Sequence, residues 1–218
     1  MLDCGGTSSL RYLIPSGRNI KKALDKNTIA KIYYAGSLTQ SQEKAKDFWF
    51  FSYACNGMNI KDIALLRWED LQDEKLTFYR AKTINTGKAD LRPVTVYLND
   101  FSKAVIEKYG NVNREPKGLI FSIIEKEQDE STRYKRIKNF TRFINQNLKL
   151  LAVSNGITGE ISTYWARHSF ATKLIRGGAP IAFVSEALNH SNIKTTQIYF
   201  AGFEDSSKKE LMKDLMNF

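Results

Sequence analysis

The sequence predicts a mainly helical (α+β) fold with one small antiparallel hairpin, and three observations support this. Apolar residues recur at spacings of three and four through much of the 218-residue chain, as they do on one face of a helix. The period changes at residues 76–82 and 92–98, which alternate and are rich in β-forming residues. Hydrophobic residues make up 42% of the chain, which is enough to build a core.

The first long helix is predicted from its start and stop signals. Thr39 and Gln42 have the spacing of a capping box. The helix that they open runs to about Cys55 and is apolar nearly all round in its second half, which indicates a buried core helix. Asn56 and Gly57 end it. The other expected helices cover residues 29–34, 59–68, 100–109, 131–153, 162–177, 180–188 and 191–199.

The two alternating segments are expected to pair as a hairpin. A polar loop with Gly87 joins them, over residues 83–90. We expect this hairpin to be the one substantial sheet of the chain.

The expected helix over 131–153 carries a basic run in its first half. The cationic residues are Arg133, Lys135, Arg136, Lys138 and Arg142. Such a run is either a solvated face or a contact to DNA, and the pattern alone leaves both open.

The charge of the chain narrows the classes of partner. Lys and Arg number 33 against 23 Asp and Glu, a formal charge of +10, which favours a nucleic acid or an anionic membrane surface. The most apolar run, residues 48–55, is far too short to span a membrane, and the N-terminus does not read as a secretory signal. Cys4 and Cys55 form no disulfide framework, so we expect a reduced, cytoplasmic protein. With two histidines and no paired cysteines, we expect no metal site.

One stretch near the C-terminus carries a specific ordered motif. It reads Arg-His-Ser-Phe-Ala-Thr over 167–172, Leu-Asn-His-Ser over 188–191 and Lys-Thr-Thr-Gln-Ile-Tyr over 194–199. This run resembles the C-terminal signature of the tyrosine recombinases, the phage integrase family. The lysine-bearing hairpin and the segment GMNIKDIALLRWEDL over 57–71 also fit the family, and the resemblance covers roughly residues 20–200.

The resemblance implies a site-specific recombinase acting in the integration or excision of a mobile element or phage. Tyr199 would attack a DNA phosphodiester and form a 3′-phosphotyrosyl bond. Arg167 and His190 would contact the phosphate, and Lys82 would protonate the leaving 5′-oxygen, with Lys88 as the competing acid. The bond energy stays in the covalent intermediate, so no cofactor and no metal are expected. A phenol with a pKa of about 10 is a poor nucleophile at neutral pH, which is why fixed cations are needed at the phosphate.

Two positions depart from the family pattern. The family's first arginine is replaced by Asn59, and the histidine three residues before Arg167 is replaced by Tyr164. Both changes resemble a subgroup of integrases carried by bacterial mobile elements. Asn59 and Tyr164 remain candidates for phosphate contact, and Arg67 and Lys88 are candidates to restore the missing charge.

Two other functions stay open, the first because of these departures and the second because it shares the tyrosine chemistry. One is a DNA-binding domain of the same fold with weakened catalysis, and the other is a strand passer like the type IB topoisomerases.

The resemblance also divides the chain and names its partners. Residues 1–19 read as a linker or a severed remnant, 20–200 as the catalytic domain and 201–218 as a tail helix exchanged between protomers. The partner is double-stranded DNA, on which the full-length protein would be a tetramer, whereas the isolated domain is expected to be a monomer. No membrane is expected to be involved, and the protein would lie in the cytoplasm on the nucleoid, encoded by a bacterium or a phage.

Overall fold

The computed structural model describes residues 23–36, 39–82, 84, 92–200, 209 and 212–213, and it is mainly helical with one small antiparallel sheet, as the sequence predicts. The helices are α1 (Lys26–Tyr33), α2 (Gln40–Ala54), α3 (Ile60–Leu65), α4 (Asp100–Tyr109), α5 (Glu130–Ser154), α6 (Thr163–Arg176), α7 (Ile181–Ala187) and α8 (Lys194–Gln197), with a 3₁₀ turn η1 (Trp68–Asp70) after α3. The strands are β1 (Leu71–Gln72), β2 (Lys75–Phe78) and β3 (Val94–Tyr97). No helix among the described residues is long and apolar enough to cross a membrane.

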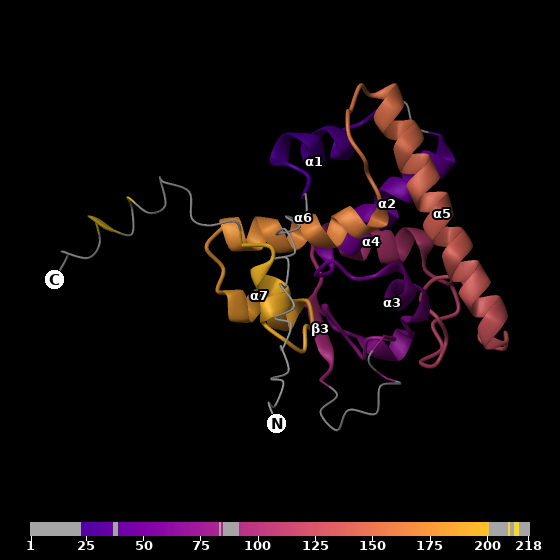
Figure 1. The fold of residues 1–218 in the computed structure, drawn as a ribbon. Coiled ribbons are helices and arrows are strands. Elements are labelled where there is room, and N and C mark those ends of the chain that lie inside the picture. Colours follow the sequence, from indigo (N-terminus) through magenta and orange to yellow (C-terminus); the bar gives the residue numbers. More distant parts are fainter. Residues whose placement is uncertain are drawn as a thin grey trace, which may run out of the picture.

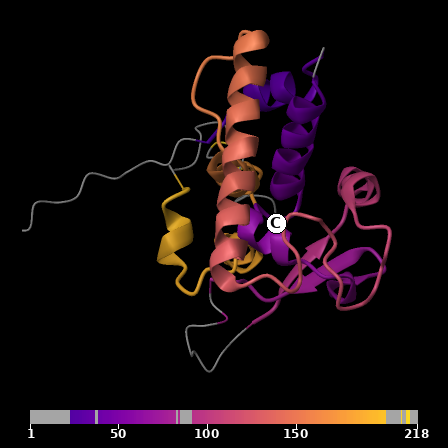
Figure 2. The same ribbon diagram turned by 90° about the vertical axis from the view of Figure 1, so that its right-hand side faces the viewer.

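Helix α2 forms as its capping signal predicts and becomes the centre of the core. The Thr39 side chain accepts a hydrogen bond from the Gln42 amide, and the Gln42 side chain accepts one from the Thr39 amide. The aromatic residues Phe48, Trp49 and Phe51 of α2 are at most 1% exposed. They pack against α4, α5 and α6, and α5 runs along one side of the molecule (Figures 1 and 2). This main core takes residues from α1 to α6 and from β2 and β3.

The turn after α2 is held in a left-handed conformation. Asn56 and Gly57 have φ values of +55° and +63°. The Met58 amide reaches back to the Ser52 carbonyl at 3.1 Å, and the Ser52 hydroxyl donates to the Met58 carbonyl at 2.6 Å. These bonds turn the chain sharply and point the Gly57 carbonyl inward, toward α6.

The sheet has three strands in the order β1-β2-β3, so the prediction of a simple hairpin was incomplete. The two residues of β1 pair with β2 in antiparallel fashion and are too few to show a period. β2 ends at Phe78, before the predicted end at Lys82, because the Asp62 carboxylate takes the Ala81 amide at 2.9 Å in place of a strand partner. Residues 80–82 therefore leave the sheet and pass beside α3 and α7.

A second, smaller cluster lies where α6 meets α7 and α8, which pack below α6 in Figure 1. Its buried members are Ala171, Ile175, Val184, Leu188 and Tyr199. Helix α6 joins the two clusters, since its Ala166 belongs to the main core and its Ala171 to the small cluster.

Some sequence predictions lie outside the described residues. These are the assignment of residues 1–19, the candidate Lys88, and the tail 201–218 apart from residues 209 and 212–213.

Candidate active site

Arg167 sits at the centre of the site and is 8% exposed. Its helix is anchored to the main core at its start, where the Trp49 indole donates to the Ser162 carbonyl and the Thr163 amide donates to Asn145. The Arg167 guanidinium donates to the carbonyls of Gly57 and Leu188. Burial, and after it the positive charge of a second arginine, lower the pKa of Arg167 to about 10, so the guanidinium is cationic at neutral pH.

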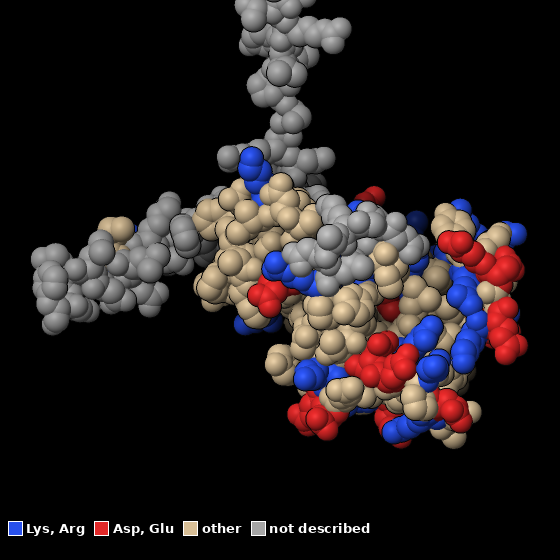
Figure 3. Space-filling model, turned by 90° about the horizontal axis from the view of Figure 1, so that it is seen from below, with Lys and Arg blue, Asp and Glu red and all other residues tan. Residues whose placement is uncertain are grey.

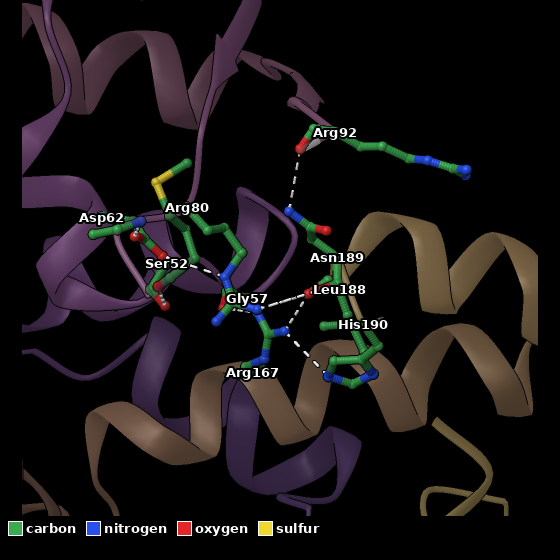
Figure 4. Close-up of polar contacts among 11 residues, drawn as sticks. Ser52, Gly57, Asp62, Arg80, Arg92, Arg167, Leu188, Asn189 and His190 are labelled. Carbon is green, nitrogen blue, oxygen red and sulfur yellow. Dashed lines mark hydrogen bonds and ion pairs between the residues drawn. The ribbon is translucent and has the colours of Figure 1, made fainter. Parts of the chain in front are cut away.

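The second arginine is Arg80, at 9% exposed, just beyond β2. One of its nitrogens donates to the Leu188 carbonyl at 3.2 Å, the same oxygen that Arg167 uses. Its Nε lies 3.6 Å from the carboxylate of Asp62, which is 5% exposed. Figure 4 shows the Arg80 and Arg167 guanidinium groups side by side, both directed at Leu188.

His190 completes a polar chain that starts at Arg167. The Arg167 guanidinium lies 3.3 Å from His190 Nε2, and His190 Nδ1 lies 2.9 Å from the Thr196 hydroxyl (Figure 4 shows the first contact). Since an arginine only donates, Nε2 accepts here, and Nδ1 carries the proton and donates to Thr196. Thr196 is fully buried, so it fixes the plane of the imidazole ring.

Tyr199 lies beside His190 at the edge of the small cluster. The two rings are parallel to within 5°, with centroids 6.5 Å apart. On its other side, the Tyr199 ring lies 5.2 Å from that of His168, which in turn meets the edge of the Tyr164 ring at 4.0 Å. Burial raises the pKa of the Tyr199 phenol to about 12, although the charge of Arg167 acts in the opposite direction. The hydroxyl is therefore neutral at physiological pH.

The structure brings together three of the four residues predicted to carry the chemistry. Arg167, His190 and Tyr199 form one connected group. Lys82 is exposed, two residues beyond Arg80, at the base of the hairpin loop. No contact described in the structure joins Lys82 to the other three residues, so its role as general acid stays a prediction.

The further candidates are spread more widely. Asn59 is the half-buried N-cap residue of α3, but its side chain makes no capping bond. Tyr164 is 53% exposed and reaches the site through His168. Arg67 has a half-exposed side chain paired with Glu69 at 3.4 Å, so its described contact is with that carboxylate.

The sequence motifs do not predict a role at the site for three residues that the structure places there: Arg80, Thr196 and Gly57. For Arg80 the sequence offers a weak signal, because the alternation expected along 76–82 places this arginine on the same side as Leu76 and Phe78, and all three are buried in the structure.

These groups can bind a phosphodiester and transfer it. Two guanidinium groups offer forked donors to its oxygens, and an imidazole and a phenol lie within the same contact network. Among the described residues, no three His, Cys, Asp or Glu side chains gather as a metal site requires.

A helical domain in which an arginine, a histidine and a tyrosine meet beside a small sheet defines the class of this protein. The model of the phage integrase family matches residues 22–205, which is most of the chain. The chain therefore belongs to the phage integrase family.

Curated relatives are similar over much of the chain. The tyrosine recombinase XerC of Pediococcus pentosaceus is 28% identical over 155 residues, which is 66% of this chain and 45% of that protein. The tyrosine recombinase XerD of Rickettsia bellii is 29% identical over 164 residues, which is 72% of this chain and 52% of that protein. The chain thus spans about half the length of these relatives.

Solved structures share the fold at low sequence identity. The Tn1549 transposon integrase in complex with transposon right end DNA has a TM-score of 0.62 at 15% identity, covering 89% of this chain and 66% of that one. The XerA recombinase has a TM-score of 0.57 at 19% identity, covering 90% and 66%. The shared fold agrees with the mainly helical class predicted from the sequence.

Proposed function

We propose that this chain is the catalytic domain of a site-specific DNA recombinase that cleaves and rejoins DNA through a 3′-phosphotyrosyl bond. The proposal includes two further points: residues 20–200 form the catalytic domain, and the recombinase acts in the integration or excision of a mobile element. The observation that carries it is the convergence of Arg167, His190 and Tyr199, which come from three separate motifs of the sequence.

The proposed reaction is an in-line transfer at phosphorus. The Tyr199 oxygen attacks, the bond from phosphorus to the tyrosine oxygen forms, and the bond from phosphorus to the 5′-oxygen breaks. The phenol gives its proton to solvent, and the 5′-oxygen takes one from a general acid that solvent then reprotonates, so the step is balanced in protons. Lys82 is the proposed donor of that second proton, because an ammonium group beside a hairpin loop can reach a leaving oxygen.

Arg167 and His190 act on the phosphate itself. Charge that develops on the non-bridging oxygens is stabilised by the fixed guanidinium donors. When a phosphate takes the place of the contact between Arg167 and His190, Nε2 takes up a proton from solvent, and the imidazolium donates to the phosphate through Nε2 and to Thr196 through Nδ1. Because Thr196 holds the opposite nitrogen, the ring keeps its orientation during this exchange.

A basic groove provides a path for the duplex beside the site. It lies between α3, the base of the hairpin and α5, and has a volume of about 1220 Å³. Its charged lining consists of Lys61, Arg133, Lys138, Arg142 and Lys149 with Glu130 and Glu160. On the lower face of the molecule, by comparison, positive and negative side chains are interspersed (Figure 3). We propose that the mainly basic lining of the groove binds the DNA backbone.

The basic run on α5 offers a matched pair of variants for this proposal. Arg142 lines the groove, whereas Arg136 pairs with Glu125 at 2.9 Å on another side of the helix. Arg142→Gln is expected to reduce by about one the slope of log binding constant against log salt concentration, since one phosphate contact is lost. Arg136→Gln should leave the slope unchanged. Equal slopes for both variants and the unaltered chain, measured by fluorescence anisotropy, would place the duplex elsewhere.

The proposed assembly follows from the number of strands. Each chain carries one nucleophile of this kind and holds one cut strand, and complete exchange between two duplexes cuts four strands. We therefore propose a tetramer of the full-length protein on DNA, working in the cytoplasm on the nucleoid.

The proposed function is tested with a nicked duplex from which the cleaved end diffuses away. The DNA site is first selected by binding from a random duplex library, and the reaction is run with EDTA. A protein–DNA adduct that survives denaturation is expected from the unaltered chain and not from Tyr199→Phe. No adduct from the unaltered chain, although it binds the selected site, would favour a DNA-binding domain without catalysis. Relaxation of arbitrary supercoiled plasmid would favour a topoisomerase.

A further inference from the structure

The site lacks one positive charge at the position where the family resemblance leads one to expect an arginine. Asn59 stands there, and an amide donates a hydrogen bond without bringing charge. The replacement for this charge should be a cation held rigidly beside Arg167, because only preorganised charge stabilises a transition state efficiently.

Arg80 meets this requirement. It is 9% exposed and shares the Leu188 carbonyl with Arg167, so the two guanidinium groups are neighbours. It also donates to the Asn189 carbonyl at 3.4 Å, which ties the end of β2 to the loop that carries His190. The Asp62 carboxylate holds the same segment through the Ala81 amide and faces Arg80 Nε.

Two positive charges lie close together at Arg80 and Arg167. Two buried guanidinium groups carry two positive charges, and among the buried described residues Asp62 is the carboxylate beside them. Like charges held together in a buried place repel strongly unless an anion joins them. A phosphodiester that binds Arg167 would place a negative charge beside both guanidinium groups.

We propose that Arg80 is the electrostatic partner of Arg167 at the scissile phosphate and takes over the role of the arginine that Asn59 replaces. The proposal rests on the recombinase function proposed above. It assigns Arg67, whose described side-chain contact is with Glu69, no part in the reaction. It also gives Asp62 a positioning role, that of holding the Arg80 side chain.

The test compares two substrates that differ in one charge. Cleavage is measured, as release of the strand that bears the 5′-hydroxyl, on a normal phosphodiester and on a methylphosphonate at the same position, which has no charge. Removing a preorganised charged donor is expected to slow cleavage of the phosphodiester by about 10²–10³-fold in Arg80→Ala. On the neutral methylphosphonate the same variant should lose less than about tenfold, because the charge it supplied is not needed there. Arg80→Lys keeps the positive charge but loses the forked donors. Its cleavage rate on the phosphodiester should therefore lie between those of the unaltered chain and Arg80→Ala.

The controls separate charge from folding. Arg114 is an exposed arginine that pairs with Glu107 at 2.6 Å, and Arg114→Ala should cleave both substrates as the unaltered chain does. Thermal unfolding of each variant shows whether the fold is kept. An equal loss for Arg80→Ala on both substrates would mean that Arg80 is only structural, and full activity on the phosphodiester would mean that it is not needed. If the unaltered chain itself fails to cleave the phosphodiester, the proposed function falls and this inference with it.

Discussion

The two buried clusters of this domain differ in size and in what they hold. The main core is built on the fully buried aromatic residues of α2 and fixes the start of α6, close to Arg167. The small cluster is made mostly of short or aliphatic side chains, with the proposed nucleophile Tyr199 at its edge. Local opening costs less where fewer apolar side chains are buried. In the proposed reaction, the phosphate is therefore bound close to the larger, more strongly packed core, and the attacking hydroxyl belongs to the smaller cluster, which is expected to open at lower cost.

The largest expected difference follows from removing one side chain from each cluster. Phe51 is fully buried and meets the Phe121 ring at 5.4 Å. Phe51→Ala should lower the free energy of unfolding by about 3–5 kcal/mol. Val184→Ala, in the small cluster, should lower it by about 2 kcal/mol, because two buried methyl groups are lost. Denaturant titrations measure both values. Hydrogen exchange in Val184→Ala should rise over 181–199 while α2 stays protected, and uniform loss of protection would mean that the two clusters open as one.

A glycine next to Arg167 gives the second test. At Gly57 an added Cβ would lie 2.6 Å from the Arg167 Cα, and φ is +63°. Gly57→Ala should therefore cost about 2–4 kcal/mol from backbone strain and overpacking, and it should displace Arg167 and abolish cleavage. Gly156 has nearly the same φ, +61°, with nothing within 4 Å of its Cβ position. Gly156→Ala should cost only about 1 kcal/mol and keep cleavage, so equal losses of activity would contradict the close packing at Gly57.

The smallest expected effect concerns the titration of Tyr199. Its pKa is about 12 in the folded chain, against about 10 in the unfolded one, so the fold favours the protonated phenol. This contribution to stability is complete below about pH 10 and is lost as the pH rises toward about 12. Between about pH 9 and about pH 11.5, unaltered protein should lose about 2 kcal/mol more stability than Tyr199→Phe. Parallel losses in urea titrations would show that the phenol titrates normally.

Much of the fold could be predicted because its signals are local. The capping box at Thr39 and the turn at Gly57 depend on neighbours in the sequence, and both are confirmed by the structure. β1 was missed because two residues have no measurable period. The end of β2 was placed too late because Asp62, from another element, takes over the backbone bond at Ala81.

The candidate site could be predicted only where a motif marks it. Arg167, His190 and Tyr199 stand in an ordered motif, and the structure brings them together. Arg80 stands in no such motif, since its importance comes from the shared Leu188 carbonyl, which is distant in sequence. The basic run on α5 divides between two sides of the helix. Arg142 lines the groove, whereas Arg136 pairs with Glu125 on another side.

The central claim is that the small cluster delivers the nucleophile to the arginines held near the main core. The most direct test locates the covalent bond in the trapped adduct by protease digestion and mass spectrometry. The account predicts that the phosphate and its remaining nucleotide are attached to Tyr199. Attachment to another residue, such as the exposed Tyr164 on the far side of His168, would contradict it.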